Sequence, residues 1–251
     1  MKEYFFIFFL FLSFQVNATP TKSMNVGWEV WYPYQYQGKN NQLMGVDISI
    51  MNAVAKQISV ELLYGELPWK RHLKYIKTGQ FDVAMGSSKT TERQSYAYFT
   101  QPYRLEEIKL FVLSEKVQTM QVQSLADVIN NQYIVGVERG YFYGEEYNNL
   151  STRDDFKNHF NEVTDLSQNI KMLLKGNIDG LLADPIAMNT YSDFFNLQGK
   201  FTQLPLYIYQ TEIHFMLSKS SMSPIDLAQF NKVITALKDS GELNKIINNT
   251  L

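Results

Sequence analysis

Strand-like and helix-like segments alternate along the first third of the chain, and this alternation limits the fold more than any other feature. The strand-like runs are apolar and are bounded by polar or turn-forming residues, which is typical of buried strands. The segments between them carry apolar residues at helical spacing, and Pro68 and Gly79 mark the start and end of the second one. The expected strands are 24–30, 60–64 and 81–85, and the expected helices are 47–57, capped by Asp47, and 69–77. This β-α-β-α-β order predicts a parallel sheet with helices on its faces.

A second α/β unit follows, and the end of the chain adds a strand and two helices. The expected strands are 108–113, 133–137, 178–183 and 213–217, and the expected helices are 124–128 with a Ser124 cap, 141–150, 168–174, 186–191, 224–237 and 242–247. Extended segments at 103–107 and 209–212 connect the units, so we expect two crossing strands that form a hinge.

These patterns predict an α/β fold of two lobes, each a mainly parallel sheet flanked by helices. We expect 19–104 and 212–251 to form the first lobe and 105–211 to form the second. A cleft between two lobes is the usual place for a small ligand to bind.

The N-terminus predicts a signal peptide. Lys2 precedes an unbroken apolar run at 5–12, which is too short to span a bilayer comfortably. The small-residue pattern Val16-Asn17-Ala18 follows, so we expect cleavage after Ala18. Because no cysteine follows the apolar run for lipid attachment, we expect release into a periplasm.

Composition argues against several classes of function. A net charge of -2 without a basic stripe disfavours nucleic acid as a partner, and the absence of cysteine excludes disulfides and thiol catalysis. The three histidines stand in unrelated segments, so we expect no metal and no other cofactor. Adjacent acids such as Glu106 and Glu107 diverge from each other on a strand, and we expect them on the solvated surface rather than in a catalytic pair.

The stretch from Phe81 to Arg93 is the strongest local indication of a site. The expected strand at 81–85 is followed by Gly86, Ser87 and Ser88, a small and hydroxyl-rich segment at the carboxyl end of a strand, where open α/β sheets bind ligands. Arg93 comes next, and its planar guanidinium can hold a carboxylate through two hydrogen bonds.

Seven segments in the same order resemble the periplasmic solute-binding proteins of polar amino-acid ABC transporters, of the glutamine-binding protein type. They are Trp31 to Tyr34, Gly45 to Ala55, Gly79 to Arg93, Tyr98 to Tyr103, Val135 to Gly140, Gly176 to Asp184 and Ile234 to Ile247. The resemblance implies a monomeric binding protein that captures an amino acid or a related small organic acid and delivers it to an inner-membrane permease.

The resemblance also implies roles for individual residues. Arg93 looks like the arginine that holds the α-carboxylate of the ligand, with Ser88 and the backbone at Gly86 as companions, and Asp184 looks like the partner of the α-ammonium. Trp31 and Trp69 stand where the family places aromatic residues beside the ligand. Trp residues are also common in cores, and Asp184 before Pro185 is also a typical helix N-cap.

Two segments differ from the family pattern, and they leave the identity of the ligand open. Tyr141 follows Gly140 where the family usually has Thr or Ser, and Arg71 belongs to a basic run after Trp69. Two alternatives to a transport protein remain: a sensory or orphan binding protein, and an enzyme similar to cyclohexadienyl dehydratases. The sequence shows no unpaired carboxylate or histidine in the expected cleft that would serve such an enzyme as general acid or base.

Overall fold

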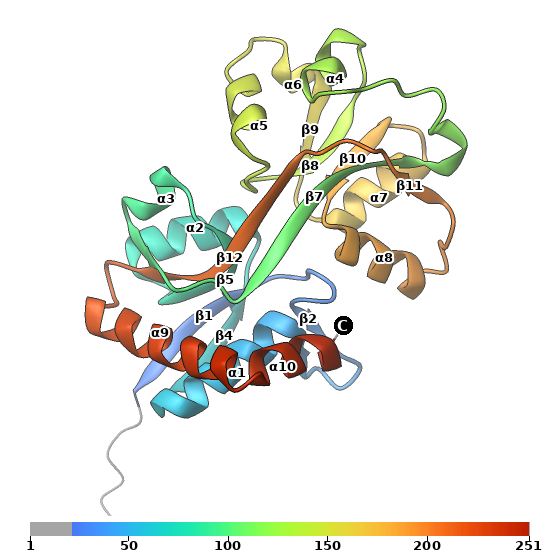
Figure 1. Ribbon diagram of the computed structural model, residues 1–251. Helices are drawn as coiled ribbons and strands as arrows, with labels where there is room; N and C mark the ends of the chain where they lie inside the picture. The colour runs from blue at the N-terminus through green and yellow to red at the C-terminus, as the bar shows by residue number, and fades with distance from the viewer. Residues whose placement is uncertain (1–21, 251) are drawn as a thin grey trace, which may run out of the picture.

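The computed structural model describes residues 22–250, which form two lobes connected by two long strands (Figure 1). The expected signal peptide and its cleavage site after Ala18 lie outside the described residues. Within residues 22–250, no helix is both long enough and apolar enough to cross a membrane.

The first lobe is built on a sheet in which three neighbouring strands are parallel, as the β-α-β-α-β order predicts. The strand order is β4 (Glu61–Glu66), β1 (Ser23–Trp28), β5 (Val83–Ser88) and then the antiparallel β12 (Tyr209–Ser218), against which the short β6 (Ala97–Phe99) also pairs. The helices of this lobe are α1 (Val46–Ile58), α2 (Trp69–Thr78), α3 (Thr91–Gln94), α9 (Pro224–Asp239) and α10 (Glu242–Thr250). A small hairpin, β2 (Tyr36–Gln37) and β3 (Leu43–Met44), precedes α1.

The second lobe repeats this plan. Its sheet has the order β11 (Phe201–Gln203), β7 (Arg104–Leu113), β10 (Gly180–Ala183), β8 (Val135–Glu138) and β9 (Phe160–Val163), and the last three strands are parallel. Its helices are a 3-10 turn (Ser114–Lys116), α4 (Ala126–Asn130), α5 (Glu145–Leu150), α6 (Phe156–His159), α7 (Leu166–Leu174) and α8 (Pro185–Phe194).

The two connections between the lobes are one antiparallel strand pair. Residues 104–108 of β7 pair with residues 209–213 of β12, and each strand then continues into the sheet of a lobe. The expectation of two extended crossing segments is therefore confirmed. The lobe boundaries proposed at 104/105 and 211/212 stay a prediction, because both strands run through them without a break.

Three local predictions were wrong. Asp47 does not cap α1: the cap is Gly45, and Asp47 is a buried residue of the first turn. Ser124 does not cap α4, whose cap position is Leu125. Residues 141–144 are not helical, and α5 begins only at Glu145.

Candidate functional site

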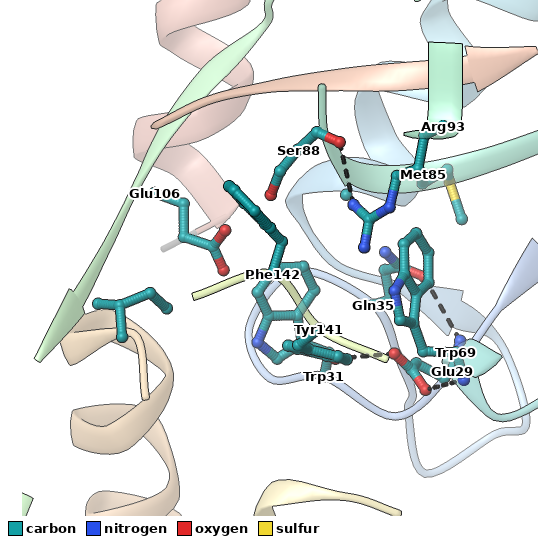
Figure 2. A pocket seen from close by; sticks show the side chains of 12 residues that line it. Glu29, Trp31, Gln35, Trp69, Met85, Ser88, Arg93, Glu106, Tyr141 and Phe142 are labelled. Carbon is teal, nitrogen blue, oxygen red and sulfur yellow. Dashed lines mark hydrogen bonds between the residues drawn. The ribbon is translucent and has the colours of Figure 1, made fainter. Parts of the chain in front are cut away.

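A cavity between the lobes brings most of the predicted site residues together (Figure 2). The predicted residues that line it are Trp31, Trp69, Gly86, Ser88, Arg93 and Tyr141. The lining residues that the sequence did not indicate are Glu29, Gln35, Met85, Glu106, Ile108 and Phe142. The cavity encloses about 370 Å³ when space open to solvent is counted, but only about 20 Å³ can hold the centre of a water molecule. That is room for one or two waters, so this part of the cleft is nearly filled by side chains.

Arg93 is held in place by its own lobe and reaches across to the other. Strand β5 extends to Ser88, so the hydroxyl-rich segment is the end of a strand rather than a loop, and Thr90 then caps α3 by accepting from the Arg93 N–H. The guanidinium donates to the carbonyl of Ser88 and to the carbonyl of Gly140, both at 3.0 Å. Its centre lies 5.4 Å from the ring centre of Trp69. Arg93 is buried, and within residues 22–250 it forms no ion pair with an acid. Burial lowers the pKa of this guanidinium.

Trp31 lies against the strand at Gly86 because that position has no side chain. A Cβ at Gly86 would come within 2.7 Å of the Trp31 ring, and the φ of +70° also suits glycine. The N–H of Gly86 donates to the hydroxyl of Tyr103 at 2.8 Å, so it is already engaged in this closed form. Gly86 therefore shapes the cavity wall.

Tyr141 crosses the cleft and joins the lobes. Its hydroxyl donates to Glu29 at 2.7 Å, and its ring packs edge-on against Trp31 at 6.0 Å and Trp69 at 6.1 Å. The preceding carbonyl, of Gly140, accepts from the indole N–H of Trp69 at 3.1 Å as well as from Arg93. Tyr141, which stands where the family usually has Thr or Ser, thus faces the cavity.

Two carboxylates line the cavity, and they differ in their partners. Glu29 accepts from Tyr141 and from the backbone N–H of Trp69 at 2.8 Å, which caps the start of α2. Burial raises the pKa of Glu29 from 4.5 to about 7, although these two hydrogen bonds oppose the shift. Glu106 is 6% exposed, and within residues 22–250 no side chain or backbone N–H donates to it. Burial raises the pKa of Glu106 from 4.5 to about 8, against the opposing effect of Arg104.

The expectation that Glu106 lies on the solvated surface was wrong. Glu106 and Glu107 do diverge, as adjacent strand residues must, but one of the two faces inward as a consequence. Glu107 is half-exposed and pairs with Lys109 at 2.7 Å, while Glu106 points into the pocket (Figure 2). The cleft therefore does contain an unpaired carboxylate.

Asp184 and Arg71 lie away from the cavity lining. Asp184 caps α8 by accepting from the N–H of Ala187 at 2.9 Å, and it accepts from the hydroxyl of Tyr34 in the other lobe at the same distance. Its pKa is raised by burial. Arg71 stands on the exposed side of α2. In the described part of the chain, no group of three or more His, Asp and Glu side chains is placed to hold a metal ion.

Comparison with known proteins agrees with the fold. Residues 24–250 match the family of bacterial extracellular solute-binding proteins, family 3. The L-cystine-binding protein TcyA of Bacillus subtilis (strain 168) is 26% identical over 229 residues, which are 89% of this chain and 79% of TcyA. ABC transporter arginine-binding protein 1 of Escherichia coli (strain K12) is 23% identical over 248 residues, with 94% of each chain covered.

A solved structure shows the same fold. An ancestral arginine-binding protein bound to arginine has a TM-score of 0.77 and 21% identity to this chain, covering 91% of this chain and 98% of the other. The chain has two lobes on a pair of crossing strands and a cavity between them, and the family match covers nearly all described residues. We conclude that the chain belongs to the bacterial extracellular solute-binding proteins, family 3.

Proposed function

We propose that this protein binds an α-amino acid in the cavity between its lobes and, as a monomer, delivers it to an ABC permease in the inner membrane. The observation that carries the proposal is the buried guanidinium of Arg93 in an interlobe cavity, without an acidic partner in residues 22–250. Two of its five N–H groups donate to carbonyls, so three are left for a carboxylate. Relatives that bind L-cystine and arginine support the same class of ligand.

Binding requires the lobes to separate first. The closed cavity holds little more than a water molecule or two, so an amino acid enters an open form and is then enclosed. Rotation about the paired segment of β7 and β12 is the motion that this topology allows. Closure on the solute excludes water and strengthens the charge-assisted hydrogen bonds to it.

A thermal-shift screen against the common amino acids and small organic acids tests this function. A solute at 100 times its dissociation constant adds about 2.7 kcal/mol to the free energy of unfolding. We expect Arg93→Ala to weaken binding at least tenfold, and Arg93→Lys to weaken it too, because an ammonium cannot form the two parallel bonds of a guanidinium. Arg71→Ala removes the same charge from the exposed side of α2 and should leave the affinity unchanged. An Arg93→Ala protein with wild-type affinity would contradict the proposal.

One observation favours a second candidate function. An unpaired carboxylate with a pKa raised to about 8, as for Glu106, is suited to act as a general acid near neutral pH. An enzyme of the dehydratase type would convert a cyclic prephenate-like acid, and product formation by the purified protein would establish this activity. We favour binding without turnover, because the relatives from Bacillus subtilis and Escherichia coli are named as binding proteins.

We also propose that the protein is exported to the periplasm and cleaved after Ala18. The apolar run at 5–12 and the ending Val16-Asn17-Ala18 support this proposal. Mass spectrometry of periplasmic material should find Thr19 at the N-terminus, and a cytosolic protein that keeps Met1 would argue against export.

A further inference from the structure

Glu106 is a carboxylic acid that is buried without a hydrogen-bond donor from residues 22–250, which is an unusual environment for this side chain. It lies on β7 within the paired hinge segment and is 94% buried, since 6% of its surface is exposed. Burying a carboxylate without a partner is strongly unfavourable, and such groups are rare unless they serve a function. In Figure 2 the Glu106 carboxylate points into the pocket from the side opposite Arg93.

Two other acids near the interface between the lobes already have donors. Glu29 accepts from Tyr141 and from the N–H of Trp69, and Asp184 accepts from Tyr34 and from the N–H of Ala187. Both acids therefore have a structural role in the closed form. Among the carboxylates of residues 22–250 that line the cavity, Glu106 is the one to which no protein group donates a hydrogen bond.

We propose that Glu106 binds a cationic N–H group of the solute, while Arg93 binds its carboxylate. This inference rests on the proposed function and assigns to Glu106 the cation-binding side of the same site, so the solute must carry an ammonium or guanidinium as well as a carboxylate. Dicarboxylic acids are disfavoured, because a second anion would face Glu29 and Glu106 in a space that excludes water. The position of Glu106 on β7 gives this contact a further consequence: the solute touches the strand pair about which the lobes move.

Two groups of a basic amino acid could supply the cation, namely the α-ammonium and the side-chain cation. Titration calorimetry with three probes separates them. L-Arginine carries both cations, L-citrulline lacks the side-chain cation, and 5-guanidinopentanoate lacks the α-ammonium. The variants are Glu106→Gln, Glu106→Asp and, as a matched control on the same strand, Glu107→Gln.

We expect Glu106→Gln to weaken binding of L-arginine at least tenfold, Glu106→Asp to have an intermediate effect, and Glu107→Gln to have none. The probe that lacks the group bound by Glu106 should bind the wild-type protein weakly. Its affinity should not change in the Glu106→Gln variant. Circular dichroism melts of each variant confirm that it is folded.

The inference is overturned if Glu106→Gln binds L-arginine with wild-type affinity. It is also overturned if the wild-type protein binds a dicarboxylate such as glutarate in preference to all three probes. Failure of the proposed function looks different, because no amino acid in the screen would then stabilise the wild-type protein, or binding would not depend on Arg93.

Discussion

At the scale of single residues, the ion pair between Arg104 and Asp47 is the most deeply buried charge contact in the described chain. The Arg104 Nε lies 2.8 Å from Asp47, and the two side chains are 4% and 0% exposed. The guanidinium lies 3.8 Å from the ring centre of Tyr34 and 4.8 Å from that of Trp31. This pair ties helix α1 of the first lobe to the first residue of the hinge strand β7.

Asp47→Ala should lower the free energy of unfolding by about 3–5 kcal/mol, because it leaves the Arg104 charge buried without a counter-charge. Urea denaturation measures the change. The matched control is Glu242→Ala, which breaks the exposed pair with Lys245 and should change stability by less than about 1 kcal/mol. A loss below 1 kcal/mol for Asp47→Ala would show that the pair does not stabilise the fold.

The residues of the cavity differ in how far the sequence could reveal them. Arg93, Ser88 and Trp69 stand in motifs whose chemistry and order point to a ligand site, and they do line the cavity. Glu106 could not be chosen from the sequence, because the pair Glu106-Glu107 is equally consistent with either residue facing inward. Only the position of β7 between two lobes determines which one is buried.

At the scale of elements, the glycine-flanked loop, residues 140–144, changes the chemistry of the cleft. Gly140 and Gly144 have φ angles of +85° and +95°, outside the right-handed helical region, so the chain is not helical at Gly144 and α5 begins only at Glu145. Tyr143 turns into the core of the second lobe, whereas Tyr141 and Phe142 line the cavity. The two glycines were visible in the sequence and could have indicated a loop; the direction of each aromatic side chain could not be predicted.

The burial of Glu29 in the closed cleft should make closure depend on pH. The pKa of Glu29 is raised to about 7 in the closed form and returns toward 4.5 when the lobes separate, so the closed form holds an extra proton between these values. The stabilisation of the closed form by protonated Glu29 is complete below about pH 4.5 and is lost as the pH rises through 7. Other charged or titratable groups that act on Glu29 are Tyr141, Glu138 and Asp165. The pKa of Glu106 is also raised, so its titration favours the closed form at low pH as that of Glu29 does.

Small-angle scattering of the ligand-free protein should therefore give a larger radius of gyration at pH 8 than at pH 5. Glu29→Gln should reduce the difference, because its amide does not titrate. Glu66→Gln, an exposed position at the mouth of the same cleft, should leave the difference unchanged. A radius of gyration that is equal at both pH values in the wild-type protein would contradict the role given to Glu29.

At the scale of the whole molecule, two hydrogen bonds between tyrosine and carboxylate hold the lobes together in the closed form. Tyr141 of the second lobe donates to Glu29 of the first, and Tyr34 of the first lobe donates to Asp184 of the second. The two-lobed architecture was predictable from the order of strands and helices, because that order limits the sheet topology. Bonds between residues 150 positions apart in sequence, such as Tyr34 and Asp184, were not predictable, since they depend on how the lobes meet.

Tyr34→Phe should weaken solute binding without weakening either lobe. The bond to Asp184 joins the lobes only when they are closed, and one such hydrogen bond contributes about 0.5–1.5 kcal/mol. Asp184 keeps its bond to the N–H of Ala187, so α8 stays capped and the melting temperature of the ligand-free protein should hardly change. We expect about two- to tenfold weaker binding of L-arginine by calorimetry, and a larger radius of gyration before the solute is added. Tyr207→Phe, at a position 66% exposed, is the matched control and should change neither quantity. If Tyr34→Phe binds L-arginine as the wild type does and stays as compact without it, the bond to Asp184 does not contribute to closure. The other contacts between the lobes, among them those of Gly140 and Tyr141 and the packing of Tyr32 on Tyr191, then hold the lobes together.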